Sequence, residues 1–288
     1  MSATKVTVIC LCYNQEEYVV EAMQSVLNQT YPTELIIVDD ASTDKSVEVI
    51  KSFLKNQRRE IKSIFLNENH GNCKAFNIAL KECESDYIID LAADDVLLPH
   101  RVEEGVKNLK ANRNVAVNFT NANYIDQNGE YIKSHFEVDD IKRSKEIVPE
   151  GDCFAAILER YYICSPSMMY NAKYLKEIGG YDESLAYEDF DIMLRLSRKY
   201  PFSYTDKILV NKRILNNSMS AKQYQKDNKQ LNSTLIICRK AFKLIKERKE
   251  KVALIKRIAY EAKQAFVNKR FILFISFINL EFKTILQK

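Results

Sequence analysis

Glycine and tryptophan are scarce in this chain of 288 residues, which has six glycines, none of them before Gly71, and no tryptophan. A dinucleotide-binding oxidoreductase needs a glycine-rich turn directly after its first strand. Sugar nucleotidyltransferases usually open with a glycine-rich phosphate loop. The N-terminal part of the chain contains neither, which argues against the oxidoreductase and leaves a sugar nucleotidyltransferase as an alternative only.

Cys-x-x-Cys pairs are absent, and the number of cysteines, seven, is odd. Cys10, Cys12 and Cys164 lie in apolar segments, so we expect reduced thiols in the core rather than disulfides or zinc ligands. No segment has the order of a secretory signal peptide, because polar residues 14–17 interrupt the first apolar stretch. These features predict a cytoplasmic protein.

Basic charge is concentrated at one end of the chain. Residues 221–288 contain 17 Lys or Arg against 5 Asp or Glu, a balance of +12, whereas residues 1–220 contain 26 against 34, a balance of −8. An acidic body argues against nucleic-acid binding and indicates an anionic partner for the last segment only. We therefore predict a first domain over residues 1–220 and a basic helical extension over residues 221–288.

Apolar strands alternate with helices in the first hundred residues. The expected strands are 5–12, 34–40, 61–69 and 86–92, and the expected helices are 14–32 with Asn14 as its N-cap, 41–57 and 71–83. Continuously apolar strands separated by helices predict a parallel sheet covered on both faces. Further along, residues 114–135 resemble a hairpin with an Asn-Gly turn, and residues 187–200 a helix that opens with acids.

Polar side chains follow three of these strands at their carboxyl ends. They are Tyr13-Asn14, Asp39-Asp40 and Asp94-Asp95. Ligands of parallel sheets bind at this edge. Adjacent carboxylates repel each other unless a cation or hydrogen-bond donors hold them, so we expect a cation between Asp94 and Asp95. A solvated turn with an N-cap is the alternative for that stretch taken alone.

Six segments in this order resemble the family 2 inverting glycosyltransferases of the GT-A fold: 6–31, 36–46, 67–80, 90–102, 179–197 and 212–220. The resemblance covers residues 5–220 and implies a Rossmann-like, mostly parallel sheet flanked by helices. It also implies metal-dependent transfer of a hexosyl or N-acetylhexosaminyl group from a nucleotide sugar, a UDP-sugar in many members. The acceptor would be a saccharide or a lipid-linked saccharide in bacterial surface polysaccharide synthesis. A non-catalytic nucleotide-sugar-binding relative stays an alternative.

The resemblance implies roles for the donor-side residues. Tyr13 would stack on the nucleobase, and Asp39 would accept a hydrogen bond from the base. Lys74 lies near the position where some members place a basic side chain on the base or the phosphates. Asp94 would lie near the ribose, and Asp95 would bind Mn²⁺ or Mg²⁺.

The remaining site residues come from the last two segments. Asp189 fits the catalytic base, and Glu188 is either an acceptor contact or the start of a helix. Arg213 is expected at the diphosphate, with a surface salt bridge as the alternative. Asp191 points about 200° around the same helix from Asp189, and we expect it to contact solvent or the helix dipole.

Leu215 stands where some members have a metal-binding histidine, which leaves the third metal ligand open. His70, His100 and His135 are expected to be surface or structural residues.

Residues 233–270 show apolar positions at helical spacing among many lysines, and residues 271–280 are almost entirely apolar. Ten residues are too few to span a bilayer as a helix. Two interpretations are compatible. The helices pack on the domain or on another subunit of a homo-oligomer, or they form a basic amphipathic surface that docks peripherally at an anionic membrane carrying the acceptor.

Overall fold

A computed structural model describes residues 4–112, 114–215 and 230–287. The chain divides into two compact units, each assembled from separate stretches. The first comprises Met1–Glu150, Ile163–Tyr181 and Pro201–Ile214, and the second comprises Gly151–Tyr162, Asp182–Tyr200 and Leu215–Lys288. The predicted domain boundary between residues 220 and 221 lies outside the described residues and stays a prediction.

The first unit is built on a sheet with nine strands among the described residues. Their order is β3-β2-β1-β4-β8-β6-β9-β5, with β7 beside β6. The strands are β1 (Val6–Cys12), β2 (Glu34–Asp39), β3 (Lys62–Phe65), β4 (Tyr87–Ala92), β5 (Val96–Leu97), β6 (Val117–Ile125), β7 (Tyr131–Ser134), β8 (Met169–Asn171) and β9 (Phe202–Arg213). Strands β1 to β4 are parallel, as predicted, and β8 joins them in antiparallel orientation. The predicted hairpin is confirmed by the antiparallel pairing of β6 with β7.

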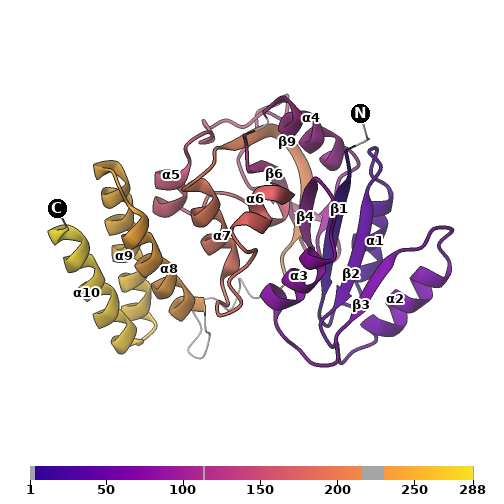
Figure 1. Ribbon diagram of the computed structural model, residues 1–288, viewed down its shortest axis with the longest axis horizontal. Coiled ribbons are helices and arrows are strands. Elements are labelled where there is room, and N and C mark those ends of the chain that lie inside the picture. The colour runs from indigo at the N-terminus through magenta and orange to yellow at the C-terminus, as the bar shows by residue number, and fades with distance from the viewer. Residues whose placement is uncertain (1–3, 113, 216–229, 288) are drawn as a thin grey trace. The chain divides into compact units, whose positions relative to one another are not determined.

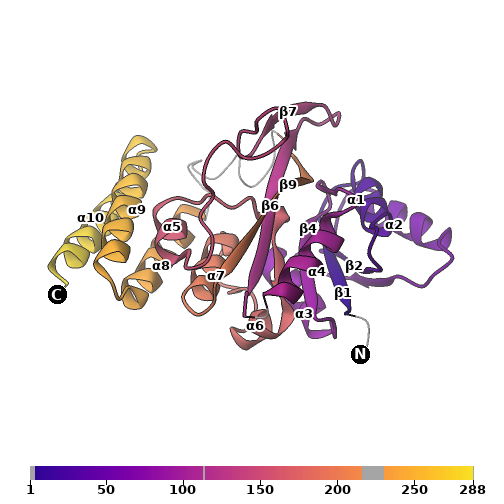
Figure 2. The same cartoon turned by 90° about the horizontal axis from the view of Figure 1, so that it is seen from above.

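Helices cover both faces of this sheet (Figures 1 and 2). They are α1 (Val19–Leu27), α2 (Ser46–Lys55), α3 (Asn72–Lys81), α4 (Arg101–Ala111) and α6 (Ala172–Glu177), with a 3₁₀ turn at Ser165–Ser167. Alternate β1 residues from Val6 to Cys12 share one apolar cluster with residues of α1, α2 and α4. Helix α3 covers the other face, where Phe76 is fully buried. The predicted two-sided cover is confirmed.

Asn14 does not cap the first helix, contrary to the prediction. Helix α1 begins at Val19, and Asn14 has a positive φ of 54°. Its Oδ1 atom accepts the backbone N–H of Thr43 at 2.7 Å. The side chain therefore bonds the loop after β2 instead of the start of its own helix.

The second unit is helical. Its helices are α5 (Phe154–Glu159), α7 (Glu188–Ser197), α8 (Gln230–Leu244), α9 (Arg248–Val267) and α10 (Phe271–Leu286). The helix that opens with acids and the helical C-terminal segment are thus confirmed. No helix within the described ranges is long and apolar enough to cross a membrane. All seven cysteines are buried, as predicted for core thiols.

Candidate functional site

The carboxyl ends of β1, β2 and β4 meet at one edge of the first unit's sheet. Cys12 lies beside Asp39 in the β1–β2 register, and the N–H of Asp40 donates to Cys12 O at 2.9 Å. On the other side of β1, the N–H of Ala93 donates to Leu11 O at 2.9 Å. The parallel register therefore brings the segments that follow these strands, including Tyr13 and Asp94, to the same edge, as the strand pattern predicted.

Asp39 is almost fully buried, and Ser42 contacts both of its carboxylate oxygens. Oδ1 accepts the backbone N–H of Ser42 at 2.9 Å, and Oδ2 accepts its hydroxyl at 2.6 Å. Tyr13, in contrast, is 45% exposed. Asn14 and Ala41 both have positive φ, at 54° and 59°, a conformation that residues with a Cβ adopt rarely and that concentrates at functional sites.

Asp40 orients the start of α3. Its two carboxylate oxygens accept the N–H groups of His70 and Gly71, each at 2.8 Å. Gly71 has a φ of +82° and precedes the helix that carries Lys74. The Lys74 ammonium lies 3.2 Å from His70 Nδ1. Sequence analysis missed this positioning role of Asp40, although its adjacency to Asp39 was a signal.

Asp94 and Asp95 form an acidic pair in which Asp95 is buried and Asp94 is half-buried. Burial, and next the charge of Asp94, raise the pKa of Asp95 to about 8, against the opposing effects of Lys212 and Arg213. Burial also raises the pKa of Asp94, against the same two cations. Two adjacent carboxyl groups with raised pKa values are suited to a bound cation, because a cation stabilises their charged forms.

Arg213 supports this pair from β9. Its backbone N–H donates to Asp95 Oδ1 at 2.8 Å, and its Nε donates to Asp94 O at 3.0 Å. Its terminal nitrogens donate to Asp126 O and Gln127 O and pair with Glu21 Oε2 at 2.6 Å. The Arg213 side chain is almost fully buried, so its ion pair with Glu21 differs from the surface salt bridge given as the alternative; its role at the diphosphate stays a prediction.

The carboxylates of Asp94 and Asp95 suit a hard divalent cation. Asp95 Oδ2 accepts no hydrogen bond from the described residues, and Mg²⁺ takes one or two carboxylates together with phosphate oxygens. Over 4–112, 114–215 and 230–287, no group of three or more His, Cys, Asp or Glu side chains is placed to hold a metal ion. The Asp94-Asp95 pair could hold such a cation together with phosphate oxygens and water.

The acidic start of α7 belongs to the second unit. Glu188 is the first residue of the helix and is buried, and Asp189 follows it in the first turn. The hydroxyl of Tyr161 donates to Asp189 Oδ2 at 3.3 Å. Tyr161 also packs against the Tyr187 ring, with centroids 5.7 Å apart. Sequence analysis missed Tyr161, because no local pattern links it to a residue 28 positions later.

Asp191 is 1% exposed, so the expectation of a solvent contact is wrong. Arg195 Nε and Lys240 Nζ each lie 2.6 Å from its carboxylate. Lys240 also pairs with Asp182 at 2.5 Å and so links the segment before α7 to the helix itself. The side chain needs these partners because an unpaired buried carboxylate is costly.

The three histidines have ordinary structural partners. His100 Nδ1 lies 3.0 Å from Glu103, His135 Nδ1 lies 2.6 Å from the Tyr124 hydroxyl, and His70 contacts Lys74. Leu215, where some relatives have a histidine, supplies no polar atom beyond its backbone.

Sequence and structure comparisons identify the protein class. The family model of glycosyl transferase family 2 matches residues 7–179, more than half of the chain. The chain belongs to this family and has the mixed α/β GT-A architecture predicted for it. It is 31% identical over 227 residues to an uncharacterized glycosyltransferase of Methanocaldococcus jannaschii, covering 75% of this chain and 73% of that protein.

Other similar proteins are larger or more distant. Escherichia coli chondroitin synthase is 29% identical over 228 residues, which cover 77% of this chain and only 31% of the synthase. Crystalline S. aureus TarS 1-349 in complex with UDP-GlcNAc superposes with a TM-score of 0.70 at 20% identity, covering 92% of this chain and 73% of that one. The mannosyltransferase PcManGT from Pyrobaculum calidifontis, in complex with GDP-Man and Mn²⁺, has a TM-score of 0.64 at 15% identity and covers 100% of this chain and 88% of that one. At these identities the two structures support the fold.

Proposed function

We propose that this chain catalyses metal-dependent, inverting transfer of a sugar from a nucleotide-sugar donor, a UDP-sugar, to a saccharide or lipid-linked acceptor. The observation that carries the proposal is the meeting of Tyr13, Asp39 and the Asp94-Asp95 pair at one edge of the sheet. An aromatic ring, a hydrogen-bond acceptor and a cation site are the groups that a base, a ribose and a diphosphate need. Support comes from the family and from two structural neighbours that bind UDP-GlcNAc and GDP-Man.

On the donor side, the exposed ring of Tyr13 stacks on the base, and Asp39 accepts from its N–H. Both oxygens of Asp39 already accept hydrogen bonds from Ser42, which holds the carboxylate in one orientation. A carboxylate oxygen has lone pairs for a further donor. Lys74 neutralises phosphate charge, and Asp94 lies near the ribose.

We assign Asp95 as the metal ligand. Mn²⁺ or Mg²⁺ bound there offsets the charge that develops on the leaving diphosphate, more strongly in the transition state than in the ground state. The PcManGT structure is a complex with GDP-Man and Mn²⁺, which supports this choice of metal. Arg213 donates its backbone N–H to the Asp95 carboxylate and its Nε–H to the backbone carbonyl of Asp94, and is therefore a positioning residue as well as a proposed diphosphate contact.

We assign Asp189 as the general base. It takes the proton of the acceptor hydroxyl while that oxygen bonds the anomeric carbon and the bond to the diphosphate breaks. Attack opposite the leaving group inverts the anomeric centre, with no covalent enzyme intermediate. The N-terminal turn of α7 favours the ionised carboxylate that a base requires. Glu188 is proposed on the acceptor side.

The acceptor belongs to surface polysaccharide synthesis in this proposal. E. coli chondroitin synthase, a polysaccharide-forming relative, supports it. A lipid-linked acceptor would place the reaction at a membrane, and we propose peripheral association through the C-terminal helices. Testing single donors identifies whether the transferred sugar is a hexosyl or an N-acetylhexosaminyl group.

Release of the nucleoside diphosphate tests the function. Purified protein is incubated with single UDP-sugars or GDP-mannose, Mn²⁺ and a panel of saccharide acceptors, and the free diphosphate is measured. We expect UDP release from one UDP-sugar that rises with acceptor. Binding of the donors without release in any combination would favour a non-catalytic nucleotide-sugar-binding protein, and release of GDP alone would correct the donor.

A further inference from the structure

Helix α10 carries an exposed apolar face. Its buried side, which includes Phe277, Leu280 and Thr284, packs against the neighbouring helices of its unit. The opposite side spans an arc of about 140° on a helical projection. Seven apolar side chains on this arc are 41–83% exposed: Phe271, Ile272, Ile275, Ile278, Phe282, Ile285 and Leu286. A helix that is apolar on nearly all sides requires a partner for its outer face.

The exposed surface continues onto the end of α9. Phe266 is 55% exposed, and its ring lies 6.0 Å from Phe271 and 5.3 Å from Phe274. Val267 beside it is 63% exposed. The apolar face therefore extends beyond a single helix.

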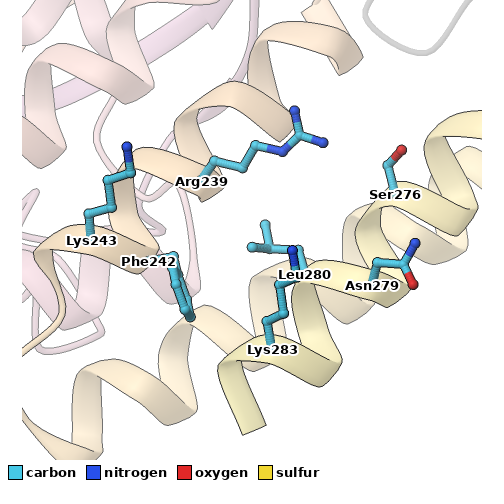
Figure 3. Close-up of a pocket in the computed structure, with 7 residues that line it drawn as sticks. All are labelled: Arg239, Phe242, Lys243, Ser276, Asn279, Leu280 and Lys283. Carbon is cyan, nitrogen blue, oxygen red and sulfur yellow. The ribbon is translucent and has the colours of Figure 1, made fainter. Parts of the chain in front are cut away.

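A cationic hollow borders this face. It has a volume of about 400 Å³ and lies between α8 and α10, with Arg239, Phe242 and Lys243 extending from α8 and Ser276, Asn279, Leu280 and Lys283 from α10 (Figure 3). Arg239, Lys243 and Lys283 form no ion pair with the described residues. Phe242 and Leu280 supply an apolar wall. The lining is therefore suited to a phosphate attached to an apolar group.

We propose that the apolar face of α10 and the hollow formed by Arg239, Lys243 and Lys283 together dock on an anionic phospholipid surface. The face enters the acyl region, and the hollow takes a lipid phosphate. Helix α10 has 16 residues and a length of about 24 Å, so it lies along the surface instead of crossing it. Lysine and arginine side chains reach the headgroups while their stems cover apolar surface.

A second copy of this chain fits these observations less well. A two-stranded coiled coil uses a narrow seam of two positions in each heptad, and the exposed arc of α10 is wider than such a seam. A partner helix would also leave the three cations without an anion. A bilayer with anionic headgroups covers the whole arc and supplies phosphates beside it.

Vesicle flotation of the full chain tests the proposal. The probes are vesicles of phosphatidylcholine alone and of phosphatidylcholine with phosphatidylglycerol, without donor or acceptor, so the result is independent of glycosyl transfer. We expect binding to the anionic vesicles. The triple variant R239Q/K243Q/K283Q should lose roughly 100-fold in affinity, whereas K55Q/K81Q/K110Q, which removes the same charge from the first unit, should change it less than about 2-fold.

The apolar contribution is tested with I275S/F282S and with I272S, which replaces the most exposed residue of the face and so avoids disturbing the packing. Both should weaken vesicle binding, whereas I141S/I147S, at exposed positions of the first unit, should not. Absence of vesicle binding by the wild type overturns the proposal. Two other results would also overturn it. One is a wild-type dimer in light scattering that dissociates in I275S/F282S, when the wild type does not bind vesicles. The other is a thermal shift with inorganic phosphate, again without vesicle binding.

Discussion

Asn77 and Tyr181 are joined by two hydrogen bonds between a side-chain amide and a backbone. The Asn77 amide donates to Tyr181 O at 2.9 Å, and the Tyr181 N–H donates to Asn77 Oδ1 at 3.0 Å. The Tyr181 hydroxyl also donates to Asp90 Oδ2 at 2.7 Å. Helix α3 thereby fixes the position of Tyr181, directly after Gly179-Gly180.

Gly180→Ala is expected to break this arrangement. Gly180 has a φ of +68°, and a Cβ there would lie 2.4 Å from Asn77 Oδ1. We expect a loss of about 2–4 kcal/mol in the free energy of unfolding, because positive φ and overpacking act together. Gly179→Ala is the matched control, since Gly179 has a φ of +82° with open space around its Cβ position and should lose only about 1 kcal/mol. Equal losses in urea unfolding would contradict the steric explanation.

Asp95→Asn is expected to remove most of the effect of Mn²⁺ on UDP binding while the fold survives. The amide preserves the size of the side chain but offers a cation only a neutral oxygen. Calorimetry with UDP in the presence and absence of Mn²⁺ measures the change, with exposed Asp140→Asn as the control. Equal UDP affinity of the wild type under both conditions would argue against the metal assignment.

Asp189→Asn is expected to lower turnover by roughly 10²–10⁴-fold with donor affinity close to that of the wild type. Asparagine can still hydrogen-bond the acceptor but cannot take its proton. Tyr161→Phe, which removes the hydrogen bond to Asp189, should cost much less. If Asp189→Asn keeps near-normal transfer and Glu188→Gln abolishes it, the base is Glu188.

Asp191→Asn is expected to reduce stability rather than chemistry. Removing one member of a buried ion pair costs about 3–5 kcal/mol, because the remaining charges lose their partner. Lys240→Met should also destabilise, and the double variant should lose less than the sum, since both changes break the same contact. Lys243→Met serves as the control on α8. An additive double variant would show that the two side chains do not stabilise each other.

The Asp182–Lys240 pair predicts acid sensitivity. Burial alone raises the pKa of Asp182, but hydrogen bonds from Lys240 and Ser184 outweigh it and lower the pKa to about 2 from 3.8. A depressed pKa in the folded state contributes stability that is present above pH 3.8 and is lost as pH falls toward 2. The melting temperatures of the wild type and of Asp182→Asn should therefore differ at pH 6 and converge at acid pH. A constant difference at all pH values would exclude this linkage.

The local sequence pattern determined the elements around the donor edge. Continuous apolar runs predicted β1, β2 and β4, and parallel strands necessarily bring their carboxyl ends to one edge. The Asn-Gly turn predicted the β6–β7 hairpin for an equally local reason, because glycine adopts the positive φ of 86° found at Gly129.

Contacts between distant segments were decided only by the tertiary structure. Pairing of β5 with β9 places Arg213 on Asp95 across 118 residues, and packing of α8 against α7 buries Asp191 against Lys240. The sequence predicted that Asp191 faces solvent. The helical period gives the direction in which a side chain leaves the helix axis, but it contains no information on which other segment packs on that side. Burial and charge pairing depend on that neighbour, and so the sequence pattern located the strand ends whereas the fold selected the partners of their charges.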